Sequence, residues 1–106
     1  LMTGRLGEDR DLAFGPEAAQ RCALMLVAQI KKYLDGDLSR VERIVKLGVF
    51  VNSAADLTDQ PKVANGASEL MQALFGDAGR HARSAVGVPA LPLGVAVEVD
   101  AVVQIR

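Results

Sequence analysis

Residues 41–53, VERIVKLGVFVNS, decide the fold class, because their side chains alternate in character with a period of two. One row is aliphatic and contains Val45, Leu47, Val49 and Val51. The other row holds Lys46, Gly48, Phe50 and Asn52. A period of two is typical of a β-strand that turns one face toward a core. We therefore predict a strand here, and we expect the segments on either side of it to pack against its apolar face.

The segment before this strand, residues 15–37 (GPEAAQRCALMLVAQIKKYLDGD), has the period of a helix. Pro16 suits the first helical position, Glu17 complements the positive end of the helix dipole, and Lys31 and Lys32 complement the negative end. The predicted apolar stripe consists of Ala19, Cys22, Ala23, Leu26, Ile30 and Leu34. We expect the helix to end at Asp35-Gly36, with its stripe facing a core.

A second helix is predicted after the strand, from Thr58 to Phe75. Thr58 or Asp59 is the expected cap, Pro61 lies in the first turn and Gly76 ends the helix. Its predicted stripe consists of Val63, Ala67, Leu70, Met71 and Leu74. Gly66 inside this helix costs about 1 kcal/mol relative to Ala, so its presence asks for a structural reason.

Two further strands are predicted at residues 81–88 (HARSAVGV) and 95–106 (VAVEVDAVVQIR). The order helix, strand, helix, strand, strand predicts one α/β domain over residues 1–106, with both helices packed on one face of a sheet. Three strands are few for two long helices, and residues 1–11 (LMTGRLGEDRD) supply at most one short edge hairpin. We therefore expect that N-terminal strands are missing from this sequence.

The composition excludes several classes of function. The 106 residues carry 12 basic and 13 acidic side chains, which leave no basic surface for nucleic acid. One cysteine and one histidine exclude an internal disulfide and a zinc-type ligand set, so we expect no metal, no cofactor and a cytoplasmic location. The longest apolar stretch, CALMLVAQI, is too short to span a bilayer.

Arg83 and Glu98 stand inside the last two predicted strands, and burying charge is costly unless it is paired or used. Arg83 shares a face with Ala85 and Gly87, while the aliphatic row of the last strand leaves Glu98 on the opposite face. We expect Arg83 and Glu98 to point away from the helices, together with Phe50, Ile44 and Val102. Small neighbours leave room for a carboxylate at Arg83. Alternatively, Arg83 and Glu98 pair with each other or line a subunit interface.

The series of motifs resembles the reactive intermediate deaminase (RidA, or YjgF) superfamily. HARSAVGVPALPLGVAVEVDAVV is similar to its C-terminal signature, in which an Arg-Ser pair, a Leu-Pro turn and a strand with an acidic residue follow one another. VERIVKLGVFVNSAADLTDQPKVANGASELMQALFG and the first predicted helix extend the resemblance over the whole chain. VANGAS and FGDAGRHARSAVG look like a divergent RidA-like or endoribonuclease-like branch.

This resemblance implies a chorismate-mutase-like fold, with a mixed sheet and two helices on one face, and a homotrimer with clefts between subunits. It also implies a deaminase of the 2-iminobutanoate/2-iminopropanoate type, which hydrolyses 2-imino or 2-enamino acids to 2-oxo acids and ammonia. Arg83 then binds the substrate carboxylate and Glu98 orients the water, with Asn65 and Ala85 also in the pocket. Ala85 stands where many members have Cys. The alternative is a non-catalytic or regulatory member that binds a small carboxylate.

Other candidate residues receive simpler interpretations. His81 has no identifiable acidic partner, so we expect a structural role, and Cys22 is expected to be a small core side chain. Gly4 and Gly7 beside Arg5 are only a weak match to a phosphate-binding loop, because no strand precedes them.

The basic residues Arg80, His81 and Arg83 are too few to bind RNA. We therefore do not expect nuclease activity.

Overall fold

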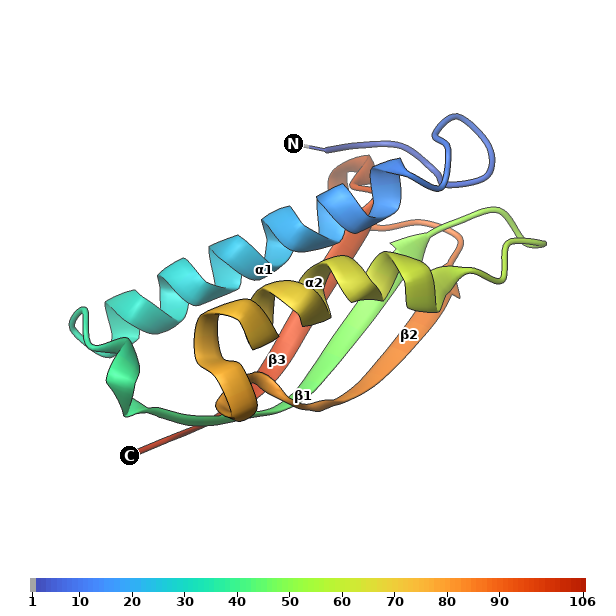
Figure 1. Cartoon of the computed structure of the whole chain (residues 1–106). Helices are drawn as coiled ribbons and strands as arrows, with labels where there is room; N and C mark the ends of the chain where they lie inside the picture. Colours follow the sequence, from blue (N-terminus) through green and yellow to red (C-terminus); the bar gives the residue numbers. More distant parts are fainter. Residues whose placement is uncertain (1) are drawn as a thin grey trace.

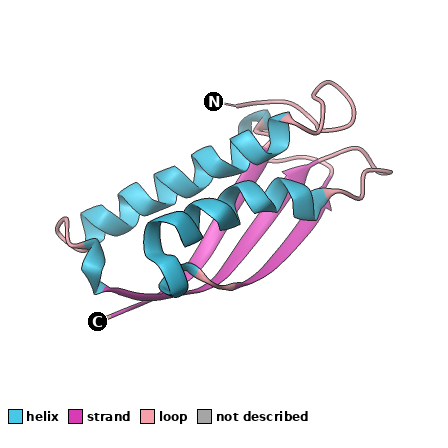
Figure 2. Ribbon diagram, in the orientation of Figure 1, coloured by secondary structure: helices cyan, strands magenta, loops and turns pink. Residues whose placement is uncertain are grey.

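The computed structural model describes residues 2–106, in which two helices lie over one face of a three-stranded sheet (Figure 1, Figure 2). The elements are α1 (Phe14–Tyr33), β1 (Val41–Asn52), α2 (Gln60–Phe75), β2 (Ala82–Val88) and β3 (Val97–Ile105). The predicted order of elements and the helix pair on one face are confirmed.

The sheet is mixed, as predicted, with β1 in the centre and the strand order β2-β1-β3. β2 runs parallel to β1 because α2 carries the chain back to the end where β1 began. β3 pairs antiparallel with the other edge of β1. Leu47 in the centre therefore lies between Arg83 on β2 and Ala101 on β3.

The inward row of β1 forms the middle of the core. Leu47, Val49 and Val51 are fully buried beneath the helices. The expectation that Ile44 lies on the outer face is wrong, because Ile44 is also fully buried. The pairing of β1 with β3 is irregular between Ile44 and Lys46, and such an irregularity shifts the alternation by one residue.

The two helices approach each other closely at Gly66, which explains the glycine in a helix interior. A Cβ atom at Gly66 would lie 2.0 Å from the carbonyl oxygen of Pro16 on α1. The stripe of α2 is otherwise buried at Val63, Ala67 and Met71, but Leu74 is half exposed, contrary to expectation. Helical periodicity specifies a face, and it does not specify how far the neighbouring elements extend along the helix.

The ends of the helices follow the local signals in part. Asp59 occupies the N-cap position of α2, but its side chain forms no capping hydrogen bond. α1 ends at Tyr33, just before the predicted stop at Asp35-Gly36. Gly36 has a φ of 89°, and its amide donates to the carbonyl of Lys31 to close the turn. Within residues 2–106, no helix combines the length and the apolarity that a membrane span requires.

The N-terminal segment contributes isolated bridges and a turn. Thr3 pairs with Val95, and Leu6 pairs with Ser53 beyond the end of β1. Leu6 is fully buried, which anchors the turn at residues 5–10 to the core. The additional N-terminal strands expected from the sequence remain a prediction.

We expect Gly66→Ala to destabilise the fold by about 1 to 3 kcal/mol, because the added methyl group overlaps backbone of α1 that cannot rotate away. Helix propensity alone predicts the opposite sign, a stabilisation of about 1 kcal/mol. Urea denaturation measures the difference, with Gln72→Ala at an exposed site of α2 as the control. A stabilised Gly66→Ala variant would contradict the close helix contact.

Candidate functional site

Arg83 lies on the face of the sheet that the helices cover, which corrects the expectation that it points away from them. Its register partner is the buried Leu47, and residues opposite each other on paired strands share a face. Arg83 Nη1 donates to Asn65 Oδ1 of α2 at 2.7 Å and to Ser68 Oγ at 3.1 Å. The prediction was wrong because β2 is an edge strand whose residues are mostly exposed on both faces. The positions of its Val residues therefore do not indicate which face the helices cover.

Glu98 lies on the opposite, uncovered face of the sheet. Its register partner is Phe50, and its side chain is exposed. The expectation that Arg83 and Glu98 share one face is therefore wrong, and the structure gives no ion pair between them within residues 2–106. One isolated copy of the chain does not present both side chains on the same side of its sheet.

Asn65 and Ala85 are the other two predicted site residues, and both lie on the Arg83 side. Asn65 accepts the shorter of the two Arg83 hydrogen bonds. Ala85 pairs with the buried Val49, so it lies one step further along the same face of β2 and is half-buried. The structure thus brings Asn65, Arg83 and Ala85 together beside α2 and separates them from Glu98.

Ser68 and His81 complete this cluster, and sequence reasoning missed Ser68. Ser68 Oγ lies 2.9 Å from His81 Nε2, and His81 Nδ1 lies 2.6 Å from the carbonyl oxygen of Gly79. The available signal was a hydroxyl residue beside Ala67 in the apolar stripe of α2, where a buried polar atom needs a partner. Arg83 therefore stands at one end of a connected polar network.

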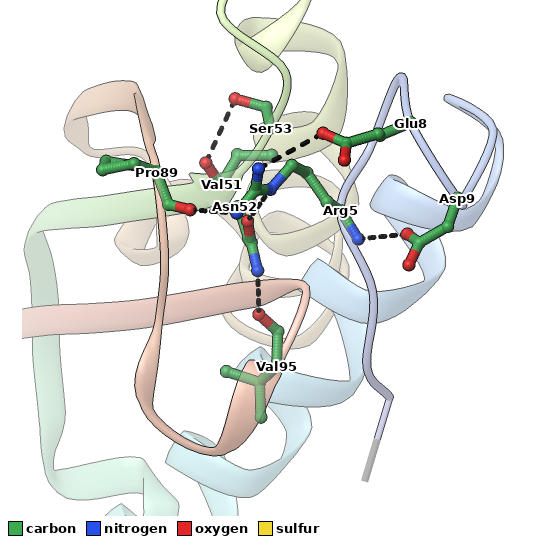
Figure 3. Close-up of polar contacts among 8 residues, drawn as sticks. All are labelled: Arg5, Glu8, Asp9, Val51, Asn52, Ser53, Pro89 and Val95. Carbon is green, nitrogen blue, oxygen red and sulfur yellow. Dashed lines mark hydrogen bonds and ion pairs between the residues drawn. The ribbon is translucent and has the colours of Figure 1, made fainter.

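A second guanidinium, that of Arg5, is committed to contacts within the chain (Figure 3). Its Nε donates to Asn52 Oδ1 at 3.2 Å, Nη1 to Glu8 at 3.2 Å and Nη2 to the carbonyl oxygen of Pro89 at 2.6 Å. These bonds tie the N-terminal turn to the end of β1 and to the loop after β2. Arg5 also borders a pocket of about 360 Å³, together with Gln60. We assign it a structural role.

Arg83 differs from Arg5 in what its guanidinium leaves free. Nη1 makes both of its hydrogen bonds, and no acceptor within residues 2–106 takes a hydrogen bond from Nε or Nη2. The residue as a whole is exposed at the edge of the sheet. A guanidinium held on one side and free on the other is suited to bind a carboxylate in bidentate fashion. In the part of the chain that is described, no three metal-binding side chains come together.

Cys22 lies away from this cluster, where α1 packs against β3. Its Sγ donates to the carbonyl oxygen of Val97 at 3.3 Å. Burial raises the pKa of the thiol, and the negative charge of Glu98 raises it further. Cys22 is half-buried against the core, in agreement with the expected packing role.

We expect Cys22 to react more slowly with iodoacetamide in the folded protein than in urea, because a raised thiol pKa lowers the thiolate fraction at a given pH. The rate profile should be displaced to higher pH. Glu98→Gln should move it back in part, whereas Glu69→Gln on α2 is the control. Equal rates in the folded and denatured chains would contradict this assignment.

Comparison with known proteins places the chain in a family. Residues 1–104 match the family model described as "YjgF/chorismate_mutase-like, putative endoribonuclease". Protein TCP17 of Trypanosoma cruzi is 55% identical over 106 residues, which are 99% of this chain and 66% of that protein. The chain thus spans about two thirds of the length of this relative.

Two solved structures resemble the chain. Atu1372 of Agrobacterium tumefaciens, described as a protein of unknown function, has a TM-score of 0.97 and 46% identity, covering 99% of this chain and 67% of its own. A "putative endoribonuclease" of Shewanella oneidensis MR-1 has a TM-score of 0.87 and 35% identity, covering 93% of this chain and 65% of its own. With the helix pair on a mixed sheet, these matches establish that the chain belongs to the YjgF/chorismate-mutase-like family.

Proposed function

We propose that this protein is a deaminase that hydrolyses reactive 2-imino and 2-enamino acids to 2-oxo acids and ammonia. The observation that supports the proposal is the guanidinium of Arg83. Asn65 and Ser68 hold its Nη1, while Nε and Nη2 have no acceptor in the described chain. Two parallel N–H groups at an exposed edge match the two oxygens of a substrate carboxylate.

The reaction requires two things of the protein: a group that orients the substrate, and a group that transfers protons to and from the attacking water. Water adds to the carbon of the protonated imine, the π electrons move to nitrogen, and the water gives up one proton. The resulting carbinolamine expels ammonia as its hydroxyl group becomes the carbonyl of the 2-oxo acid. Arg83 fixes the carboxylate next to the reacting carbon, and a second carboxylate, Glu98, accepts and returns the proton. The small side chain of Ala85 leaves room beside Arg83.

The opposite faces of Arg83 and Glu98 favour a site shared by two copies of the chain. In a closed ring of subunits, the Arg83 edge of one copy meets a different surface of the next, which can carry Glu98. The uncovered face of the sheet also exposes Val86 and Val102, at 45% and 58%. Apolar side chains of this size suit burial between subunits. A homotrimer with clefts between its subunits, located in the cytoplasm, is part of the proposal.

Arg83→Ala should lower kcat/KM for 2-iminobutanoate by about 100-fold, because it removes two charge-assisted hydrogen bonds. Ammonia and 2-oxobutanoate release from the enzymatically generated imine measures this in the full-length protein. Arg80→Ala is the matched control, since the Arg80 side chain is 78% exposed and pairs with Asp77. Binding of 2-oxobutanoate without turnover would favour the non-catalytic carboxylate binder.

Mixing two impaired variants tests whether the site is shared. Arg83→Ala and Glu98→Gln should each keep only about one hundredth of the activity alone, but equal mixtures that exchange subunits should recover about a quarter of the wild-type rate. In those oligomers some clefts combine an intact Arg83 with an intact Glu98 from the neighbour. Native mass spectrometry verifies the exchange. Two variants that are each impaired alone and gain no activity after subunit exchange would contradict a site shared between copies, and a Glu98→Gln variant that is active alone would remove Glu98 from the reaction.

A further inference from the structure

The hydrogen bond between Ser68 and His81 joins α2 to the segment that leads into β2. Ser68 Oγ is 2.9 Å from His81 Nε2 and also accepts a hydrogen bond from Nη1 of Arg83 at 3.1 Å. Ser68 is only 7% exposed. A buried hydroxyl group must satisfy its hydrogen and its oxygen within the protein, because water does not reach it freely. The donor and the acceptor of each hydrogen bond in the network can therefore be assigned.

The carbonyl of Gly79 fixes the tautomer of His81. A carbonyl oxygen only accepts hydrogen bonds, so at 2.6 Å from His81 Nδ1 it requires a hydrogen on Nδ1. The other tautomer would place the lone pair of Nδ1 against the lone pairs of that oxygen. A neutral imidazole with Nδ1–H has an acceptor at Nε2. Ser68 must then donate its hydroxyl hydrogen to Nε2.

The same direction makes Ser68 an acceptor for Arg83. Once the hydroxyl hydrogen points to His81, the lone pairs of Oγ are available to the Nη1–H of Arg83. A cationic imidazole would instead place two positively charged donors on one hydroxyl oxygen. It would also leave the hydroxyl hydrogen without an acceptor among the hydrogen bonds of the described residues.

We infer that His81 is a positioning residue for Arg83. Its Nδ1–H tautomer orients Ser68 as an acceptor, and Ser68 with Asn65 holds Nη1 so that Nε–H and Nη2–H stay free for a planar carboxylate. The inference rests on the proposed function in taking Arg83 as the carboxylate anchor. It assigns a role in substrate orientation to a histidine that touches neither the substrate nor Arg83.

The tautomer is measured directly, without any enzyme assay. His81 is the single histidine of the 106 residues, so a protein labelled with 15N-histidine gives one pair of ring nitrogen signals. In the neutral ring we expect a protonated Nδ1 and an unprotonated Nε2, with the Nε2 signal changed by Ser68→Ala. A hydrogen on Nε2 in the neutral ring would overturn the inference, whatever the protein catalyses.

The role in binding is measured with 2-oxobutanoate as the probe ligand, by calorimetry. His81→Leu and Ser68→Ala should each weaken binding by about threefold to tenfold, since one neutral hydrogen bond that orients Arg83 is lost. His81→Gln should bind within about twofold of wild type, because its amide oxygen can accept the Ser68 hydrogen bond. Ser84→Ala, on the opposite face of β2, is the control.

The outcomes separate this inference from the proposed function. Unchanged binding in both His81→Leu and Ser68→Ala would overturn the positioning role, even if the wild type turns over imines. A wild-type protein that neither binds 2-oxobutanoate nor releases ammonia would refute the proposed function, and with it the assignment of Arg83 as an anchor. Thermal unfolding of each variant shows whether it is folded. If His81→Leu does not fold, Ser68→Ala and His81→Gln still compare the loss of the hydrogen bond with its replacement.

Discussion

The hydrogen-bonded pairing of β1 with β2 and with β3 determines both the core and the position of the candidate site. Residues opposite each other on paired strands share a face, so the buried row of Leu47, Val49 and Val51 determines which faces of β2 and β3 the helices cover. Arg83 pairs with a member of this row and Glu98 does not. One backbone register thus produces the core and also places the two candidate site residues on opposite faces of the sheet.

The close packing of the helices positions the polar network. Gly66 lets α2 approach α1 at Pro16, and Asn65 and Ser68 flank that glycine on the same helix. A shift of α2 would therefore move both acceptors of Arg83 together. The close contact with Pro16 explains why a helix interior contains a glycine that costs intrinsic stability.

The two arginine clusters show how similar side chains acquire different roles. Arg5 donates from all three of its side-chain nitrogens to groups of the same chain and joins three segments (Figure 3). Arg83 donates from Nη1 alone, and its Nε and Nη2 have no acceptor in the described chain. The difference lies in the number of acceptors nearby, which depends on the tertiary arrangement and cannot be read from the local sequence around either arginine.

The elements, their order and the family could be predicted from the sequence, because periodicity and turn residues act locally and the motifs occur in series along the chain. The sequence also predicted that Asn65 accompanies Arg83, through the resemblance. The face on which Arg83 lies, the burial of Ile44 and the contact of Ser68 with His81 became clear only from the folded chain. Alternation along a strand separates two faces without saying which one is covered, and that choice is made by strand pairing and helix packing between residues far apart in the chain.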